Sequence, residues 1–317
     1  MDDRLGIGVD IGATRVRVCV GDAKGKFLWR ESRIIPLPQR AEEYVEEILT
    51  LVRKAAKQVP GRAGPAGVGV ASVGPLDLER GGMDSPANLP YGFVPIVGPL
   101  AESLGTEVTL MNDASAAALG ESRFGAGKGC DNLVYVTLST GIGGGAMVDG
   151  HLLSGKDGNA AEIGHVMVDP SGRLQCGCGG MGHWEAYCSG KSIPRFAELL
   201  AAEDGGPKEV AKDAKSVDSA AIFRAAARRS AAAMRVVKEV GRLNAVGVAN
   251  AVNMFDPSLV TIGGGVALNN PAAVLGPIRR LVPKLSINGA PRIMITPLGD
   301  DAGLLGALSL AFGEPAP

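Results

Sequence analysis

The chain contains two copies of one pattern: an apolar strand, a turn rich in glycine and threonine, and a second strand. The first copy covers residues 6–22 (GIGVDIGATRVRVCVGD) and the second covers residues 133–150 (LVYVTLSTGIGGGAMVDG). Apolar β-forming runs bounded by glycine turns are typical of paired strands. A repeat separated by about the length of one domain predicts two related α/β domains, each contributing one hairpin to a shared cleft.

The rest of the chain alternates between helix and strand patterns. Helices are predicted over 40–59, 114–124, 220–255 and 301–312, and strands over 66–71, 106–111, 133–138, 146–148, 259–262 and 292–296, with an irregular loop at 81–92. This alternation predicts an α/β fold. We expect a small domain at 1–114, with 301–317 forming a C-terminal helix that packs back on it, and a large domain at 115–300.

The glycine turns are candidate phosphate sites, because backbone amides without side chains can approach an anion closely. Neither of the first two turns matches the GxxxxGK[ST] loop, and a tight hairpin needs the same glycines, so this alternative stays open. A third turn, between the strand at 259–262 and the next helix, places Gly264 and Gly265 at a helix start. Asp10 ends a strand before the first turn, where a carboxylate can meet a phosphate-bound Mg²⁺ directly or through water. The candidate cofactor-binding residues are Asp10, Gly12, Ala13, Thr14, Arg15, Thr140, Gly141, Gly143, Gly264 and Gly265.

A cluster of cysteine and histidine lies between residues 159 and 190, which hold two of the three histidines and three of the five cysteines. His165, Cys176, Cys178 and His183 can supply the two imidazoles and two thiolates of a closed tetrahedral zinc site. The spacing is not that of a zinc finger, because one residue separates the cysteines and His183 follows Cys178 by five positions. The alternative is that the cysteines are small buried apolar residues and the histidines lie on the surface.

Several polar residues remain that neither a metal nor a phosphate requires. Asp113 follows a strand and precedes an apolar helix, so it is either a helix N-cap or a general base that accepts a hydroxyl proton during phosphoryl transfer. Glu162, Glu185, Asn88 and Asn112 could each bind one or two hydroxyl groups, which a polyol substrate requires.

Charge and composition exclude other classes of partner. The chain has 32 Lys and Arg against 33 Asp and Glu, so no overall basic field attracts nucleic acid or an acidic membrane. No stretch is apolar for long enough to span a bilayer, and the acidic N-terminus does not resemble a signal peptide. An odd number of cysteines, with two in CxC form, fits a reducing compartment, so we expect a cytoplasmic protein.

Taken together, these segments resemble the ROK family (repressors, open reading frames, kinases) within the actin-like ATPase superfamily. The match extends from Asp10 to the last helix and rests on GVDIGATRVRV, SPANLP, MNDASAAALGE and STGIGGGAMVDG, followed by AEIGHVMVD and CGCGGMGHWEAYCSG, which resemble the family's zinc signature. The resemblance implies two actin-like (ribonuclease H-like) domains flanking a cleft, with a zinc knuckle. His183 departs from the pattern, because the family usually has a cysteine there.

The resemblance also implies the role of each site residue. Asp113 would be the catalytic base, and the sugar ligands would be Asn88, Asn112, Glu162, His165 and Glu185. His165 would bind zinc with one ring nitrogen and a sugar hydroxyl with the other, so that a structural Zn²⁺ orients a substrate ligand.

The expected activity is transfer of the γ-phosphate of ATP, with Mg²⁺, to the 6-hydroxyl of a hexose, with glucose as the first candidate. Fructose, mannose and N-acetylhexosamines are the alternative substrates. The preferred hexose, other phosphoryl donors and the choice between a dimer and a tetramer stay open, although the resemblance favours a homo-oligomer. A sugar-sensing repressor is a second class, but Asp10 lies too near the N-terminus to leave room for the helix-turn-helix of those members.

Overall fold

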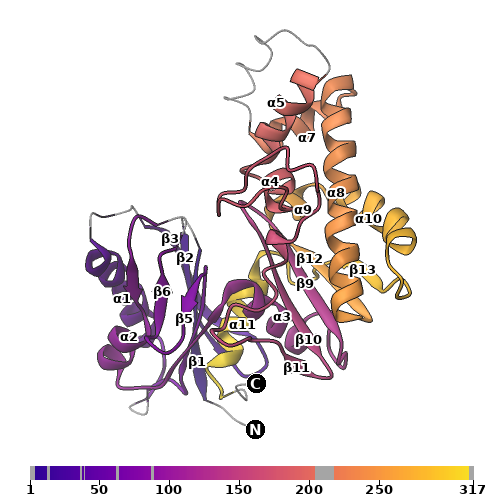
Figure 1. The fold of residues 1–317 in the computed structure, drawn as a ribbon. Coiled ribbons are helices and arrows are strands. Elements are labelled where there is room, and N and C mark those ends of the chain that lie inside the picture. Colours follow the sequence, from indigo (N-terminus) through magenta and orange to yellow (C-terminus); the bar gives the residue numbers. More distant parts are fainter. Residues whose placement is uncertain are drawn as a thin grey trace. The chain divides into compact units, whose positions relative to one another are not determined.

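The chain folds into two units of mixed α/β structure (Figure 1). A computed structural model describes residues 4–12, 15–35, 38, 40–61, 64–86, 89–203 and 218–313. The first unit is drawn from 1–131, 145–161 and 301–317, and the second from 132–144 and 162–300. The domain limits expected from sequence, 1–114 with 301–317 and 115–300, stay a prediction. Among the described residues, no helix is both long and apolar enough to cross a membrane.

The first glycine-rich copy forms the centre of a five-stranded sheet with the strand order β3-β2-β1-β4-β8. Its strands are β1 (Leu5–Ile11), β2 (Arg15–Asp22), β3 (Phe27–Ile34), β4 (Val68–Ser72) and β8 (Val108–Asn112). β1, β2 and β3 are antiparallel neighbours, whereas β1, β4 and β8 are parallel. Parallel strands require crossover connections, and the helices of the first unit provide them.

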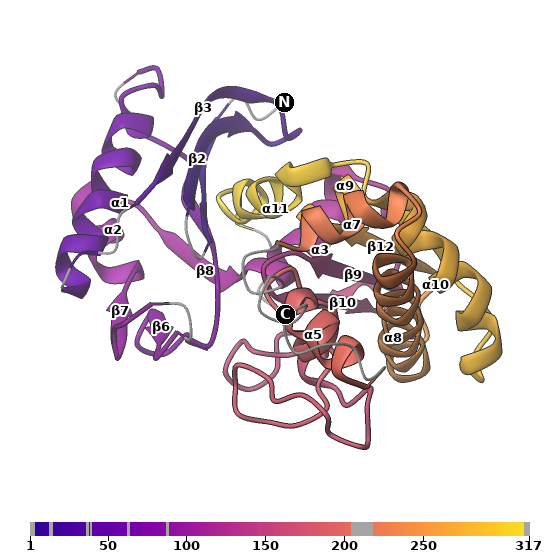
Figure 2. The same ribbon diagram turned by 90° about the horizontal axis from the view of Figure 1, so that it is seen from above.

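Different helices cover the two faces of this sheet (Figure 2). The helices of the first unit are α1 (Ala41–Ala56), α2 (Val97–Leu104), α3 (Asp113–Phe124) and α11 (Ala302–Leu310). Ile7, Val9 and Ile11 alternate along β1 and share one buried cluster with the apolar stripe of α1. On the other face, α11 packs against β1, β4 and α3. The predicted helix at 301–312 is therefore confirmed as an element.

Two glycines permit the close approach of α11. A Cβ on Gly69 of β4 would overlap the carbonyl oxygen of Ala307, and a Cβ on Gly306 would overlap that of Ala116 in α3. Larger residues here would push the last helix away from the sheet.

The prediction of an irregular loop over 81–92 is partly wrong. A small antiparallel sheet contains β5 (Leu76–Asp77), β6 (Gly82–Asp84) and β7 (Phe93–Pro95) in that order. Met83 pairs with Val94, and both side chains are fully buried. Tertiary burial of these two residues outweighs the turn-forming composition around them.

The second unit contains the parallel strands β9 (Leu133–Leu138), β12 (Leu259–Gly263) and β13 (Arg292–Ile295). Its helices are α4 (Glu185–Cys188), α5 (Ile193–Glu203), α7 (Ser219–Ala227), α8 (Ala231–Phe255), α9 (Gly265–Asn269) and α10 (Pro271–Leu285), with short 3₁₀ turns η1 (Ile163–His165) and η2 (Gly299–Asp301). α8 is the longest of these helices and packs along α10 (Figure 1).

Two predicted boundaries in this part of the chain are wrong. The helical region 220–255 is two helices, because Arg229 adopts a left-handed backbone conformation (φ 66°) between α7 and α8. The predicted turn 139–145 is shorter, because β10 (Ile142–Val148) starts within it and runs from the second unit into the first, where it pairs with β11 (His151–Leu152). Gly145 within this strand has no room for a side chain, because a Cβ there would lie 2.5 Å from the carbonyl oxygen of Ala114.

Candidate active site

Asp10 forms an ion pair in the first unit. The antiparallel register places it opposite Arg17 on β2. Its Oδ2 accepts hydrogen bonds from Nε (2.9 Å) and Nη2 of that guanidinium, and Nη1 of Arg17 lies 4.0 Å from Oδ1 of Asp301. Burial raises the pKa of Asp10, while the charge and hydrogen bonds of Arg17 oppose the rise. Sequence reasoning missed Arg17, although strand alternation brings it to the face of Asp10.

The first glycine turn is described in part. Gly12 donates its N–H to the carbonyl oxygen of Arg15 at 2.9 Å, which closes the turn, and the Arg15 side chain is exposed. Ala13 and Thr14, both expected to contact phosphate, lie outside the described residues, as does the expected sugar ligand Asn88.

Asn112 is the helix cap at the end of β8. Its Oδ1 accepts hydrogen bonds from the N–H groups of Ala114 (2.9 Å) and Ser115 (3.2 Å). Both groups lie in the first turn of α3, where backbone donors have no partner within the helix. Asp113 is therefore the first helical residue and not the N-cap, and its half-buried carboxylate also accepts from the N–H of Ala114. The helix dipole favours a negative charge at this position.

The four predicted metal ligands come together in the second unit. One donor atom each from His165, Cys176, Cys178 and His183 all lie within 4.8 Å of one another. Nδ1 of His165 lies 3.7 Å from Sγ of Cys176, and Nδ1 of His183 lies 3.3 Å from Sγ of Cys178. In a tetrahedral zinc site, bond lengths of about 2.0 to 2.3 Å put ligand atoms roughly 3.3 to 3.8 Å apart. The two nitrogen–sulfur separations fall in this range, and the donor set is compatible with this ion.

The two glutamates beside these ligands differ in their surroundings. Oε2 of Glu162 lies 3.9 Å from Nε2 of His165, and its side chain is 42% exposed. Burial raises the pKa of Glu162, and His165 opposes the rise. Glu185 is half-buried at the start of α4, and its Oε2 accepts a hydrogen bond from the N–H of Ile142 at 2.8 Å. A free carboxylate oxygen remains on Glu162, which makes it the more open of the two toward a ligand.

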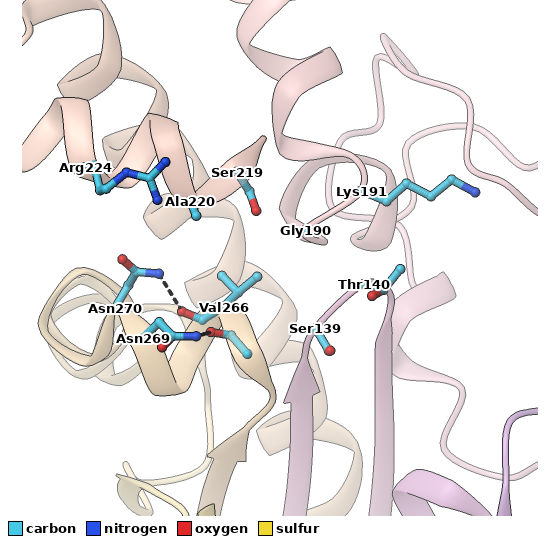
Figure 3. Close-up of a pocket in the computed structure, with 11 residues that line it drawn as sticks. Ser139, Thr140, Gly190, Lys191, Ser219, Ala220, Arg224, Val266, Asn269 and Asn270 are labelled. Atoms are coloured by element: carbon cyan, nitrogen blue, oxygen red, sulfur yellow. Dashed lines mark hydrogen bonds between the residues drawn. The ribbon is translucent and has the colours of Figure 1, made fainter. Parts of the chain in front are cut away.

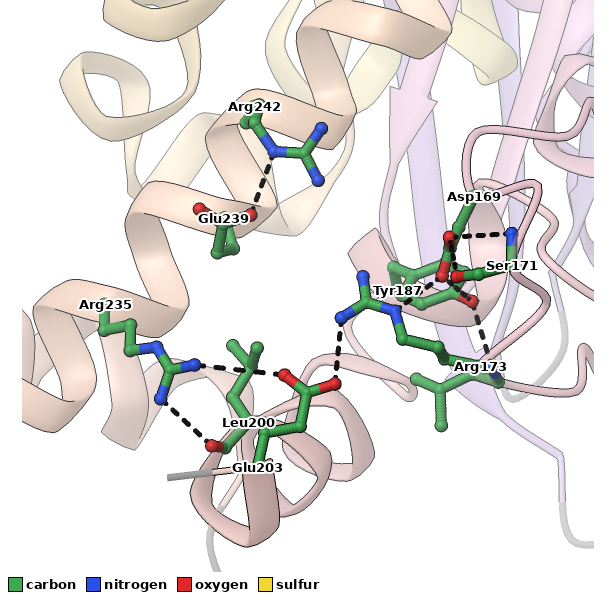
Figure 4. Close-up of polar contacts among 10 residues, drawn as sticks. Asp169, Ser171, Arg173, Tyr187, Leu200, Glu203, Arg235, Glu239 and Arg242 are labelled. Atoms are coloured by element: carbon green, nitrogen blue, oxygen red, sulfur yellow. Dashed lines mark hydrogen bonds and ion pairs between the residues drawn. The ribbon is translucent and has the colours of Figure 1, made fainter. Parts of the chain in front are cut away.

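Residues 165–183 carry the four candidate metal ligands and are called the metal-binding loop. Hydrogen bonds of an indole and of a carboxylate attach this loop to the helices of the second unit. Trp184 is fully buried and donates its Nε1–H to Oδ1 of Asn244 on α8 at 2.8 Å. Asp169 accepts hydrogen bonds from Ser171, from Nε of Arg173 (2.8 Å) and from the hydroxyl of Tyr187 (2.8 Å), as Figure 4 shows. Arg173 also forms an ion pair with Glu203 on α5, and Glu203 forms an ion pair with Arg235 on α8. Sequence reasoning did not identify this network.

A cavity of about 720 Å³ lies within the second unit (Figure 3). This volume is typical of small-molecule sites. Four segments line it: the turn after β9, the junction of α4 and α5, the start of α7 and α9. Its residues are Ser139, Thr140, Gly190, Lys191, Ser219, Ala220, Arg224, Gly265, Val266, Asn269 and Asn270. The cavity contains two of the residues predicted to contact a cofactor, Thr140 and Gly265.

The charged and amide groups of the cavity were missed from sequence. Among its described lining residues, Lys191 and Arg224 are the charged ones and none is acidic. Asn269 donates its Nδ2–H to the carbonyl oxygen of Gly265 (2.7 Å), and Asn270 donates to that of Val266 (2.9 Å). A backbone carbonyl only accepts, so these bonds fix which end of each amide is the nitrogen, and each Oδ1 is left as an acceptor.

Comparison with known proteins extends over nearly the whole chain. The family model for the ROK family matches residues 6–314. A glucokinase from Streptomyces coelicolor is 34% identical, with 99% of each chain covered. A ROK family glucokinase from Streptomyces griseus, solved with glucose and AMPPNP, superposes with a TM-score of 0.79 at 34% identity over 96% of this chain and 98% of that chain. A ROK hexokinase from Thermus thermophilus gives 0.80 at 34% identity, with 97% and 98% covered. The mixed α/β sheets described above match these kinase structures, and the chain belongs to the ROK family.

Proposed function

We propose that the protein is an ATP-dependent glucokinase that transfers the γ-phosphate of ATP to the 6-hydroxyl of glucose. The observation that carries the proposal is the 34% identity, over 96% or more of this chain, to proteins named glucokinase, one of them solved with glucose and an ATP analogue. The fold and the small-molecule cavity of the second unit support it.

Asp113 is the proposed general base. Its carboxylate lies at the N-terminus of α3, where the helix dipole favours a negative charge. As the 6-oxygen of the sugar bonds to the γ-phosphorus and the bond from that phosphorus to the β,γ-bridging oxygen breaks, Asp113 accepts the hydroxyl proton and ADP leaves. Phosphoryl transfer asks a protein mainly for positioning and charge stabilisation, so one placed carboxylate is sufficient as base.

The proposed sugar ligands are Glu162, His165 and Glu185 in the second unit and Asn112 in the first, together with Asn88. Glu162 has carboxylate oxygens exposed to solvent, as a hydroxyl-binding group requires. Asn112 uses its Oδ1 to cap α3, so its Nδ2 is the group left to donate to a hydroxyl.

The cavity of the second unit is proposed to bind the adenosine part of ATP. The Oδ1 atoms of Asn269 and Asn270 can accept from N–H and O–H donors such as an adenine amino group or ribose hydroxyls. The phosphates would meet the glycine turns, and Mg²⁺ would enter as part of the Mg·ATP substrate. Asp10 is the proposed contact to that ion, through water, because Arg17 already occupies its Oδ2.

A structural zinc ion is proposed for His165, Cys176, Cys178 and His183. The observed spacing of these donors supports it, and histidine replaces a cysteine without loss of a ligand. Four protein ligands would leave the ion no open position, so it would order the loop and supply no nucleophile. His165 would keep its second ring nitrogen for the sugar.

A coupled assay of ADP formation with glucose tests the function. We expect turnover by the wild type and a decrease in kcat of at least about 100-fold for Asp113→Asn, because the amide cannot accept the proton. Asn253→Ala, outside the proposed site, is the matched control and should keep kcat. Absence of glucose-dependent ADP formation by the zinc-loaded wild type would overturn the proposal, and a panel of fructose, mannose and N-acetylglucosamine would then identify another hexose.

A further inference from the structure

Glu185 contacts both the metal-binding loop and the turn after β9. Its Oε2 accepts the N–H of Ile142 at 2.8 Å, while its Oε1 lies 3.8 Å from Sγ of Cys176. All three residues belong to the second unit. A hydrogen bond to a carboxylate is about twice as strong as one between neutral groups, so the contact to Ile142 constrains the turn.

The segment after Glu185 holds the other end of the same turn. Gly190 donates its N–H to the carbonyl oxygen of Ser139 at 2.7 Å, and Lys191 donates to that of Thr140 at 3.3 Å. Three backbone groups of the turn therefore form hydrogen bonds with residues 185–191: the carbonyl oxygens of Ser139 and Thr140 accept, and the N–H of Ile142 donates. Gly141 lies between them, and a Cβ there would lie 2.6 Å from Oε2 of Glu185. The turn is shaped to receive this carboxylate.

The same turn lines the cavity proposed for the nucleotide. Ser139 and Thr140 come from the turn, and Gly190 and Lys191 come from the segment that holds it. Figure 3 shows Ser139, Thr140 and Gly190 close together at one edge of the cavity. On the other side, Glu185 lies two positions after the predicted ligand His183, whose carbonyl oxygen accepts the N–H of Ala186 at 3.0 Å. The short helix α4 therefore links the metal-binding loop to the wall of the cavity, so a change in the order of the loop can change the order of that wall.

We propose that Glu185 is a positioning residue for the nucleotide, and that it couples metal occupancy at His165, Cys176, Cys178 and His183 to nucleotide affinity. The inference rests on the proposed nucleotide role of the cavity. It adds to the sugar-binding role proposed for Glu185, which would use the remaining acceptor capacity of Oε1. Loss of the metal or of the carboxylate frees the turn, so binding a nucleotide must then order it at a cost in affinity.

Calorimetric titration with Mg·AMPPNP, in the absence of sugar, tests the coupling. We expect Glu185→Ala to weaken binding about tenfold, equivalent to about 1.4 kcal/mol. Glu185→Gln should remain within about threefold of the wild type, because its amide oxygen still accepts from Ile142. Glu162→Ala is the matched control, because it removes the other carboxylate beside the candidate metal ligands. Within the described part of the chain Glu162 contacts His165 and not the turn, so nucleotide affinity should stay while glucose affinity falls.

Removing zinc with a chelator from the wild type and from Glu185→Ala completes a thermodynamic cycle, in which the two changes are made singly and together. The chelated wild type should lose about as much nucleotide affinity as Glu185→Ala, and chelation should weaken Glu185→Ala little further. In a measurement independent of any variant, the amide of Ile142 in the wild type should exchange with solvent faster after chelation. Nucleotide binding by Glu185→Ala as tight as in the wild type, or unchanged exchange at Ile142, would overturn the coupling alone. If the zinc-loaded wild type bound no nucleotide, the proposed function would fall and this inference with it.

Discussion

At the scale of single residues, neighbouring side chains divide tasks that the sequence does not separate. Asn112 and Asp113 are adjacent and both suit a helix start, but the backbone turns so that the asparagine caps α3 and the aspartate does not. Asp113 is the first residue of α3, and proton transfer stays its proposed role. Asp10 similarly gains its partner Arg17 from strand pairing, seven positions along the chain.

Asn270 provides a prediction about the cavity. Asn270→Ala should raise the KM for ATP about two- to tenfold, because one hydrogen bond contributes roughly 0.5 to 1.5 kcal/mol. The KM for glucose should not change. Steady-state kinetics with each substrate varied in turn measures both values. Asn253→Ala serves again as control, since its Oδ1 accepts from Ile287 outside the cavity. An unchanged KM for ATP would remove Asn270 from the nucleotide site.

At the scale of elements, the metal-binding loop depends on two supports. The metal would tie its chain together at one end, and the Asp169 network attaches it to α4, α5 and α8 at the other (Figure 4). Burial raises the pKa of Asp169, but hydrogen bonds from Ser171, Arg173 and Tyr187 outweigh it and hold the pKa well below its ordinary value. The ionised form therefore stabilises the fold.

The stability that Asp169 contributes depends on pH because its pKa is lowered in the folded protein. A carboxyl group whose pKa is lower in the folded than in the unfolded chain contributes stability at pH values above its unfolded-state pKa. This stability is lost as the pH falls through the folded-state pKa. Asp169→Asn should lower the free energy of unfolding by roughly 2 to 3 kcal/mol at pH 7. The difference from wild type should shrink below about pH 4, as the wild type itself loses this contribution.

Denaturant unfolding across this pH range measures the effect of Asp169→Asn. Glu203→Gln is the control, because its pair with Arg173 is partly exposed and should contribute at most about 1 kcal/mol. A difference independent of pH would mean that shape, and not charge, is what Asp169 contributes.

The metal ligands provide a second prediction for the loop. Replacing Cys176 and Cys178 by serine should abolish zinc binding, raise the KM for glucose and lower the melting temperature, because the ion orients the loop that presents His165. Metal content by mass spectrometry, kinetics and thermal melts measure the three effects. Cys130→Ser, remote from the cluster in sequence, is the control. Loss of metal with unchanged glucose affinity would separate the zinc site from sugar binding.

At the scale of the whole molecule, the two ends of the chain meet in one unit. The last helix, α11, covers the face of the sheet that contains the first strand, and Cys19 shares a buried cluster with Leu304 and Leu308. The first unit therefore cannot bury its sheet until the chain is complete. The homo-oligomer expected from the family resemblance stays a prediction.

Truncation before residue 301 tests this dependence. Removing α11 exposes the apolar face of β1, β2 and β4, so the first unit should lose its native packing. The two tryptophans report separately: Trp29 belongs to the first unit and Trp184 to the second. Single-tryptophan variants should show a red-shifted emission for Trp29 and an unchanged one for Trp184. Native emission from Trp29 in the truncated chain would contradict the prediction.

The sequence by itself determined the strand and glycine-turn hairpins, the alternation of α and β, and which four side chains could hold a metal, because these depend on local periodicity and on side-chain chemistry. Only the tertiary structure decided which residues meet across long separations. Gly69 and Gly306 are required by the close packing of α11, Asp169 meets Tyr187 across a loop, and Glu185 reaches Ile142, which lies 43 positions earlier in the chain. Such contacts depend on how elements pack, and no local pattern encodes that packing.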